Sequence, residues 1–152
     1  MKKILFVCTG NSCRSVMAEG LFRKLIGAKA SDYSAASAGI SAVDGFPPSE
    51  PTVRALKDQG IDVTDHQSQR LSSELVNDAH KVIVMEKMHR DWVLELVPDA
   101  AEKTELLTQY SSKQTSRLSD IDIPDPIRMS ESFYKNVLTV IRECVQNFIK
   151  TL

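Results

Sequence analysis

The chain alternates between short apolar runs and longer stretches in which apolar residues recur at helical spacing. The short runs predict strands at residues 3–8, 33–37, 81–85 and 104–107. The longer stretches predict helices at residues 15–26, 50–59, 72–79, 88–96 and 130–151. Because short apolar strands are separated by amphipathic helices, the pattern indicates an α/β fold with a parallel sheet covered on both faces.

The last predicted helix carries the clearest apolar stripe. The stripe comprises Phe133, Val137, Ile141, Val145 and Phe148, and it is widened by Val140, Cys144 and Ile149. A stripe of this period is typical of a helix that packs one face against a core. We therefore expect this helix to cover one face of the sheet and Cys144 to be a core residue.

Composition agrees with one domain over residues 1–152, since 42% hydrophobic residues can supply a core. A net charge of −1 gives no electrostatic reason to expect nucleic acid or an anionic membrane as a partner. No apolar run is long enough for membrane insertion, and the first one is too short for a secretory leader. Three cysteines without a disulfide framework suit a cytoplasmic location.

A candidate nucleophile, Cys8, lies where the first strand ends and a tight polar turn leads into a helix. At such a turn several backbone N–H groups point into one concave site, and the helix dipole adds partial positive charge. That arrangement binds anions and stabilises a thiolate, and the Arg14 guanidinium adds a planar donor suited to phosphate. We therefore expect a phosphate-binding loop made of Thr9, Gly10, Asn11, Ser12, Cys13, Arg14 and Ser15.

The spacing of Cys8 and Arg14 alone is weak evidence, because a buried cysteine and an unrelated surface arginine give the same pattern. The residues between them favour catalysis. Gly10 and Asn11 tolerate the positive φ that a phosphate-wrapping loop demands. The Ser15 hydroxyl follows the arginine, where it can donate to the thiolate. A thiolate in an oxyanion cradle indicates phosphoryl transfer through a cysteinyl-phosphate.

Asp125 is the second catalytic candidate. A phosphoryl group that leaves a phenol requires a proton on the leaving oxygen, and a carboxylic acid near the cradle can supply it. Pro124 and Pro126 restrict the backbone on either side of Asp125. Asp120 and Asp122 lie nearby, so Asp125 could instead be one of several solvated turn carboxylates.

These residues carry a family resemblance that extends over nearly the whole chain. The run from Val7 to Glu19 resembles the signature of the low-molecular-weight protein tyrosine phosphatases. Ser37-Ala38-Gly39-Ile40 resembles the end of their second strand, and Ile123-Pro124-Asp125-Pro126 resembles their general-acid loop. Residues 84–89 and the C-terminal tail resemble the bacterial branch that serves exopolysaccharide tyrosine kinases. Val16 and Ile127 depart from the family, which usually has Pro and Tyr there.

The resemblance implies a four-stranded, flavodoxin-like phosphotyrosine phosphatase I fold that uses neither metal nor cofactor. It implies that Cys8 is the nucleophile, Arg14 the phosphate ligand and Asp125 the general acid. It also implies that Ser37 and His66 hold Asn11 in a left-handed conformation, although His66 could equally be a surface histidine. His80 and His89 have the pattern of helix-end or surface residues, and no Cys/His spacing typical of a metal site is present.

Cys13 has two interpretations. It could be a small buried residue at the helix start, or a resolving thiol that forms a reversible disulfide with an oxidised Cys8.

The sequence therefore predicts a phosphatase for phosphotyrosine in proteins, with an exopolysaccharide-related kinase as one such partner. Phe46 or an aliphatic surface would contact the phenyl ring in place of the missing Tyr. Three alternatives remain. A protein arginine phosphatase has a small hydroxyl residue at the position of Ser12, and its acid loop also lacks the Tyr. A thioredoxin-coupled arsenate reductase would need further cysteines, and residues 86–92 contain none. An inactive phosphate-binding module would need neither Cys8 nor Asp125.

Overall fold

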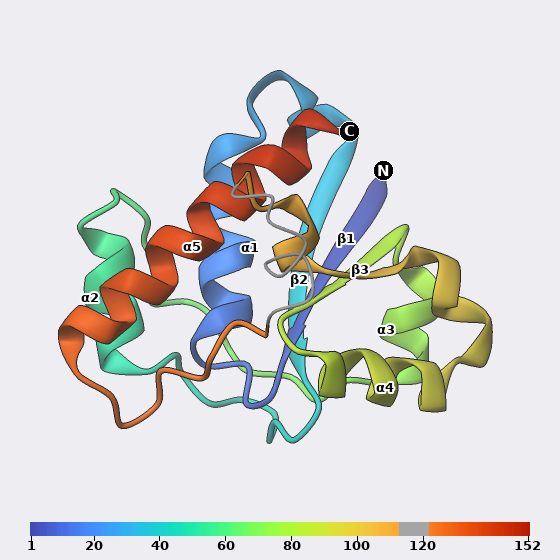
Figure 1. Ribbon diagram of the computed structural model, residues 1–152, viewed down its shortest axis with the longest axis horizontal. Helices are drawn as coiled ribbons and strands as arrows, with labels where there is room; N and C mark the ends of the chain where they lie inside the picture. Colours follow the sequence, from blue (N-terminus) through green and yellow to red (C-terminus); the bar gives the residue numbers. More distant parts are fainter. Residues whose placement is uncertain (113–121) are drawn as a thin grey trace.

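Four parallel strands form the centre of the molecule in the order β2-β1-β3-β4 (Figure 1). The computed structural model describes residues 1–112 and 122–152. Its strands are β1 (Lys2–Cys8), β2 (Tyr33–Gly39), β3 (Lys81–Val84) and β4 (Thr104–Leu106). The predicted four-stranded parallel sheet is thereby confirmed.

Each predicted helix is present, with ends displaced by at most two residues. The helices are α1 (Arg14–Leu25), α2 (Glu50–Lys57), α3 (Ser73–Asp78), α4 (Lys87–Leu96) and α5 (Glu131–Lys150). Three short 3-10 turns were not predicted: Gly27–Ser31, Pro98–Lys103 and Leu107–Tyr110. Among the described residues, no helix has the length and apolarity needed to cross a membrane.

Serine hydroxyls fix the starts of three helices. Ser49, Ser72 and Ser130 each precede a helix in extended conformation and accept a hydrogen bond from a backbone N–H of its first turn. These bonds satisfy N–H groups that have no partner inside the helix. The start of α5 is therefore defined locally by Ser130, only five residues after Asp125.

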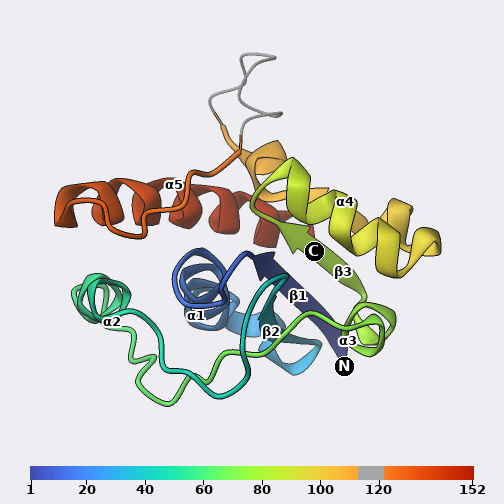
Figure 2. The same cartoon turned by 90° about the horizontal axis from the view of Figure 1, so that it is seen from below.

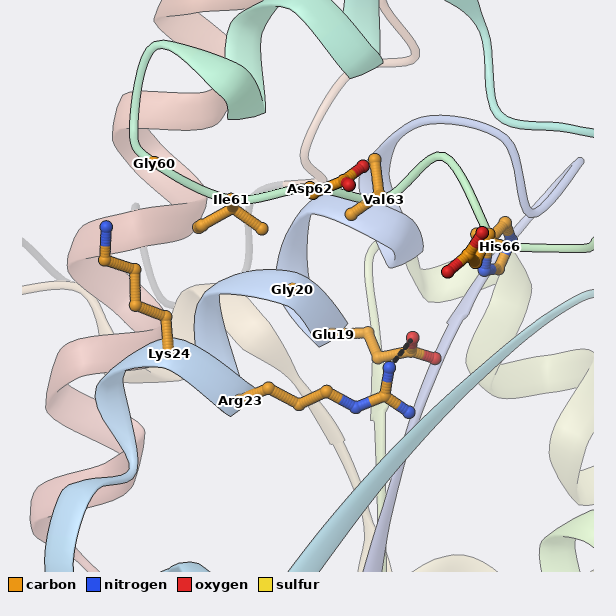
Figure 3. Close-up of a pocket in the computed structure, with 10 residues that line it drawn as sticks. Glu19, Gly20, Arg23, Lys24, Gly60, Ile61, Asp62, Val63 and His66 are labelled. Carbon is orange, nitrogen blue, oxygen red and sulfur yellow. Dashed lines mark ion pairs between the residues drawn. The ribbon is translucent and has the colours of Figure 1, made fainter.

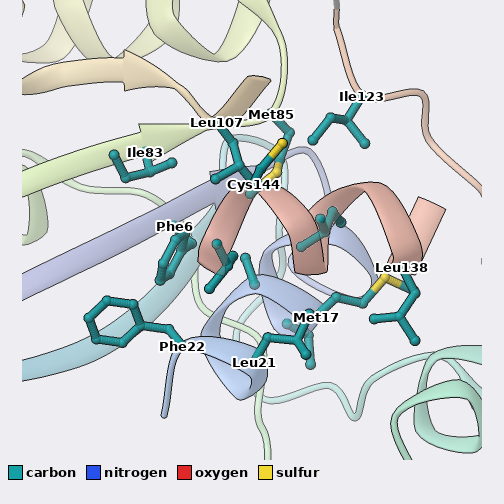
Figure 4. Close-up of a cluster of buried hydrophobic side chains, with 14 of the residues drawn as sticks. Phe6, Met17, Leu21, Phe22, Ile83, Met85, Leu107, Ile123, Leu138 and Cys144 are labelled. Atoms are coloured by element: carbon teal, nitrogen blue, oxygen red, sulfur yellow. The ribbon is translucent and has the colours of Figure 1, made fainter. Parts of the chain in front are cut away.

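Alternate residues of each strand pack into two separate cores. On one face, Phe6 and Ile83 contact α1 and α5, and the Phe6 and Phe22 rings lie 5.8 Å apart (Figure 4). On the other face, Leu5 and Val82 pack against α3 and α4. The two layers of helices lie on opposite sides of the sheet (Figure 2). This double covering explains why β1 is apolar at every position from Ile4 to Cys8 and β3 from Val82 to Val84.

The buried face of α5 differs in part from the predicted stripe. Val140, which was expected to widen the stripe, is 43% exposed, and Phe133 is only partly buried. Tyr134 and Leu138 are buried in their place. The prediction was wrong at these positions because the apolar sequence covers more of the helix circumference than its contact with the sheet does.

Cys8 ends β1, the strand that lies between β2 and β3. The chain leaves β1 toward β2 on one side and later returns to β3 on the other, so β1 is the topological switch point of the sheet. Ligands in open α/β sheets bind outside the carboxyl ends of strands at such a point. The fold thus brings the predicted nucleophile to the expected position for a site.

Candidate active site

The loop between β1 and α1 presents its backbone N–H groups without internal partners. Within the described residues, the N–H groups of residues 10–13 have no hydrogen-bond acceptor. They lie between the end of β1 and the first turn of α1, whose dipole adds partial positive charge. Unpaired N–H groups at a helix N-terminus form an anion-binding site. The loop therefore has the donor arrangement that was predicted for a phosphate cradle.

Asn11 holds this loop in shape. Its φ of 53° is left-handed, and its side chain is fully buried. The amide nitrogen donates to Ser15 Oγ at 2.8 Å and to Ser37 Oγ at 2.9 Å, while Oδ1 accepts from the Gln69 N–H at 2.9 Å. His66 Nε2 lies 3.1 Å from the Asn11 carbonyl oxygen. Ser37 and His66 therefore both contact Asn11, as the sequence had suggested.

Of the two loop residues that tolerate positive φ, only Asn11 adopts it, and Gly10 does not. One left-handed residue suffices to turn the loop, because Asn11 is fixed by three side-chain hydrogen bonds. Asparagine tolerates this conformation at lower cost than most residues with a Cβ.

The thiol of Cys8 is buried beneath the loop and touches Ser15. Cys8 is 2% exposed, and its Sγ lies 2.9 Å from Ser15 Oγ. Ser15 Oγ already accepts from the Asn11 amide nitrogen, which can only donate. The Ser15 hydroxyl hydrogen is therefore free to donate to Cys8 Sγ.

Arg14 is a fully buried guanidinium that joins three parts of the site. Its Nη1 donates to Glu86 Oε2 at 2.6 Å and to the Ile123 carbonyl oxygen at 2.7 Å. Its Nη2 donates to Thr9 Oγ1 at 3.3 Å. The Ile123 bond ties the acid loop to the cradle, and Glu86 provides the opposite charge that a buried guanidinium needs.

Asp125 lies beside this guanidinium at the surface of the site. Its Oδ2 is 3.6 Å from Arg14 Nη2, and its side chain is 40% exposed. Asp122 is directed away, because its Oδ1 accepts from the Lys87 N–H at the start of α4. Asp120 lies outside the described residues. Of the two described candidates for the general acid, only Asp125 contacts Arg14.

Cys13 lies at the start of α1 among hydroxyl groups. Its Sγ is 3.3 Å from Ser49 Oγ and 3.8 Å from the Tyr134 hydroxyl. Burial and the hydrogen bond to Cys13 raise the pKa of Tyr134. Cys8, Cys13 and Cys144 are all free thiols, and the role of Cys13 as a resolving thiol stays a prediction. Burial raises the pKa of Cys144 to about 12, as expected for a core cysteine.

The two departures from the family pattern lie in different surroundings. Val16 is buried inside α1, where it packs in the core. Ile127 is 53% exposed beside the acid loop, and Phe46 is 59% exposed. An apolar side chain is therefore available at the position of the missing Tyr.

His89 belongs to the site, although the sequence had suggested a helix-end or surface residue. It is fully buried in the first turn of α4, and its Nε2 lies 2.9 Å from Thr9 Oγ1. Burial, followed by the charge of Arg14, lowers its pKa to about 4. The sequence did contain a signal for the pairing of Glu86 with His89. The glutamate follows a strand directly and stands three residues before the histidine.

A separate cleft of about 570 Å³ lies between α1 and the loop of residues 60–66 (Figure 3). Neither Cys8, Arg14 nor Asp125 lines it. Arg23 in its wall pairs with Glu19 at 2.9 Å. His66 separates this cleft from the Asn11 carbonyl oxygen. The cleft is thus separate from the loop between β1 and α1. No group of three potential metal ligands was found within residues 1–112 and 122–152.

The sequence is similar to a known family and to phosphatases of known name. A sequence model of the family described as "Low molecular weight phosphotyrosine protein phosphatase" matches residues 3–152. The chain is 31% identical to the low molecular weight protein-tyrosine-phosphatase Ptp of Acinetobacter johnsonii, over 98% of this chain and 96% of that protein. It is 38% identical to a protein-arginine-phosphatase of Geobacillus stearothermophilus, over 82% of this chain and 78% of that protein.

A solved structure of similar shape is that of Vibrio vulnificus Wzb in complex with benzylphosphonate. It superposes with a TM-score of 0.87 at 34% sequence identity, covering 99% of each chain.

Proposed function

This chain belongs to the low molecular weight phosphotyrosine protein phosphatase family, and from that membership we propose that it hydrolyses phosphotyrosine in proteins through a cysteinyl-phosphate on Cys8. The observation that carries the proposal is the convergence of three groups. The Cys8 thiol is buried at the start of the loop, Arg14 is buried at its end, and Asp125 Oδ2 lies 3.6 Å from Arg14 Nη2. These groups are the proposed nucleophile, phosphate ligand and general acid.

In the first step the Cys8 thiolate attacks phosphorus and the bond to the phenol oxygen breaks. Arg14 and the N–H groups of residues 10–13 bind the non-bridging oxygens, which carry negative charge throughout. Asp125, as a carboxylic acid, gives its proton to the departing phenolate. The products of this step are tyrosine, a cysteinyl-phosphate and an Asp125 carboxylate.

In the second step the Asp125 carboxylate takes a proton from water, and the water oxygen attacks phosphorus. The bond between phosphorus and Cys8 Sγ breaks, and inorganic phosphate is released. The Ser15 hydroxyl, 2.9 Å from Sγ, stabilises the departing thiolate. Asp125 returns to its acid form, so the cycle requires no metal or redox cofactor.

The hydrogen bonds around Asn11 serve this chemistry by fixing the loop before substrate binds. Its amide contacts both Ser15 and Ser37, and its carbonyl oxygen contacts His66. Donors that are already oriented need not reorganise during the reaction. Ser37 and His66 are therefore supporting residues that act through Asn11.

Substrate preference is tested most directly by competition between peptides of one sequence that carry phosphotyrosine, phosphoserine or phosphoarginine. Ile127 and Phe46 are exposed apolar side chains, and we propose that they contact the aromatic ring of the substrate. The proposal predicts the highest kcat/KM for phosphotyrosine. A preference for phosphoserine would contradict it.

Phosphoarginine is the second candidate substrate. It is favoured by the similarity to a protein-arginine-phosphatase and by two residues, Ser12 in the loop and Ile127 in place of the aromatic residue. A preference for the phosphoarginine peptide would make phosphoarginine the substrate. The proposed roles of Cys8 and Arg14 would be unchanged. Arsenate reduction lacks support, because residues 86–92 contain no cysteine for a relay.

We also infer that the physiological substrate is a tyrosine-phosphorylated protein of the cytoplasm, such as an exopolysaccharide-related tyrosine kinase. The support is the resemblance of residues 84–89 to the bacterial branch that serves such kinases. Incubation of the phosphorylated kinase with the phosphatase should remove its phosphotyrosine, and persistence of the phosphotyrosine would argue against this partner.

A further inference from the structure

The imidazole of His89 is held in one tautomer by its surroundings. Its Nδ1 lies 3.0 Å from the backbone nitrogen of Glu86, a group that can only donate. Nδ1 therefore has no hydrogen, and the neutral ring carries its hydrogen on Nε2. Burial and the neighbouring Arg14 charge keep the ring neutral, because they lower its pKa to about 4.

The hydrogen on Nε2 is directed at Thr9. Nε2 lies 2.9 Å from Thr9 Oγ1 and 3.5 Å from Glu86 Oε2, and that carboxylate oxygen already accepts from Arg14 at 2.6 Å. The shorter contact makes Thr9 Oγ1 the acceptor. His89 thus reaches across from α4 to the residue that follows the nucleophile.

Thr9 Oγ1 accepts a second hydrogen bond from Arg14 Nη2, at 3.3 Å. A hydroxyl oxygen has two lone pairs and one hydrogen, and neither partner here can accept. The Thr9 hydroxyl hydrogen must therefore point away from both His89 and Arg14. Among the described residues, no acceptor lies within hydrogen-bond distance of it. Thr9 is partly exposed, so a bound molecule can accept from this hydrogen.

We propose that the Thr9 side chain is an additional donor to the bound phosphoryl group and that His89 is the positioning residue that fixes this donor. The inference rests on the proposed function, since it assigns a further ligand to the same anion. Arg14 Nη2 contacts both Thr9 Oγ1 and Asp125 Oδ2. An oxygen bound by Nη2 consequently lies beside the Thr9 hydroxyl, on the side of the site that carries Asp125.

The test uses inorganic phosphate as the probe and calorimetry of the reduced enzyme as the measurement, so that it does not depend on turnover. Thr9→Val removes the hydroxyl and conserves the shape of the side chain. Hydrogen bonds to charged groups are the strong ones, and the loss should weaken phosphate binding about 10-fold. Thr9→Ser, the matched control, retains the hydroxyl and should bind phosphate within about twofold of the parent.

The role of His89 is tested by measuring how one substitution at His89 changes phosphate affinity in two backgrounds, the parent and Thr9→Val. His89→Leu should weaken phosphate binding in the parent but not in the Thr9→Val background, because it acts through the Thr9 hydroxyl. His89→Gln, which can still donate, should recover part of the affinity. An equal effect of His89→Leu in both backgrounds would overturn the positioning role.

If His89→Leu does not fold, the Thr9 variants alone test whether the Thr9 hydroxyl donates to phosphate. A folded Thr9→Val that binds phosphate as tightly as the parent would overturn the donor assignment and leave the proposed function intact. A parent that neither binds phosphate nor hydrolyses aryl phosphates would instead overturn the proposed function.

Discussion

Gly39, at the end of β2, lies against the backbone of Thr9 in the catalytic loop. A Cβ on Gly39 would be 2.5 Å from the Thr9 carbonyl oxygen and 2.8 Å from the Asn11 nitrogen. Both atoms belong to the backbone, so neither can rotate away. The glycine is required by this close approach and not by its φ.

Gly39→Ala should therefore displace the loop and lower kcat/KM by about 100-fold, the cost of misplacing a catalytic group by roughly 1 Å. Steady-state kinetics on an aryl phosphate would measure the loss. Gly20→Ala is the matched control, because its Cβ would meet only side chains, with Ile61 Cγ2 nearest at 3.1 Å. A Gly39→Ala enzyme with parental kcat/KM would contradict the rigid cradle.

Asp125→Asn separates a general acid from a solvated turn carboxylate. Loss of the proton donor should slow single-turnover hydrolysis of phosphotyrosine by roughly 10²–10⁴-fold. For aryl phosphates with acidic leaving groups, the rate of the same step should decrease much less, since their phenolates leave without a proton. Single-turnover rates are required because Asp125 also activates water in the second step.

Asp122→Asn is the control for Asp125. Its Oδ1 accepts from the Lys87 N–H, and an asparagine oxygen can do the same. If Asp125→Asn slowed both kinds of substrate equally, the role of general acid would pass to another carboxylate.

Oxidation tests whether Cys13 protects the nucleophile. Peroxide should convert Cys8 to a sulfenic acid, which the Cys13 thiol then captures as a disulfide with loss of water. Activity of the parent should return with a thiol reductant, whereas Cys13→Ser should be inactivated irreversibly. Cys144→Ser should recover like the parent, because Cys144 is buried and its pKa is raised to about 12. Full recovery of Cys13→Ser would make Cys13 a structural residue only.

The buried His89 should make stability depend on pH. Its pKa is lowered from 6.5 to about 4 in the folded protein. Between these values the unfolded chain binds a proton that the folded chain excludes. The free energy of unfolding should consequently decrease as the pH falls from 6.5 toward 4, by up to about 3 kcal/mol.

Urea unfolding at pH 7 and at pH 4.5 measures this decrease. His89→Gln should show a smaller difference between the two pH values than the parent does. His80→Gln, which changes an exposed histidine, should retain the parental difference. Equal differences for parent and His89→Gln would show that other groups cause the pH dependence.

Local sequence signals and the family resemblance predicted much of this site, including the contacts of Ser37 and His66 with Asn11. They missed the long-range contact of His89 with Thr9. The strand, loop and helix around Cys8 follow one another in the sequence, so Cys8 and Arg14 could be recognised from their order. Asp125 was recognisable from its flanking prolines and the family resemblance. His89 is 80 residues from Thr9, and only the pairing of β1 with β3 brings them together. A single histidine in an amphipathic helix carries no signal of such a contact.

Two further features of the structure have physical causes that sequence patterns do not contain. The positive φ falls on Asn11 alone because its side chain is fixed by Ser15, Ser37 and Gln69. Val140 is exposed because the sheet contacts only part of the circumference of α5. In both cases the local sequence allowed more than one arrangement, and tertiary contacts determine which one is present.

If phosphate passes through Cys8, a covalent intermediate on its sulfur can be trapped. An aryl phosphate with an acidic leaving group would be mixed with the Asp125→Asn enzyme, quenched with acid within the first turnover, and digested for mass spectrometry. Loss of the water-activating carboxylate should let the intermediate accumulate. We expect phosphate on the peptide that contains Cys8, attached through sulfur and absent from Cys8→Ala. Phosphate on a histidine or serine of the parent loop, or parental turnover by Cys8→Ala, would contradict it.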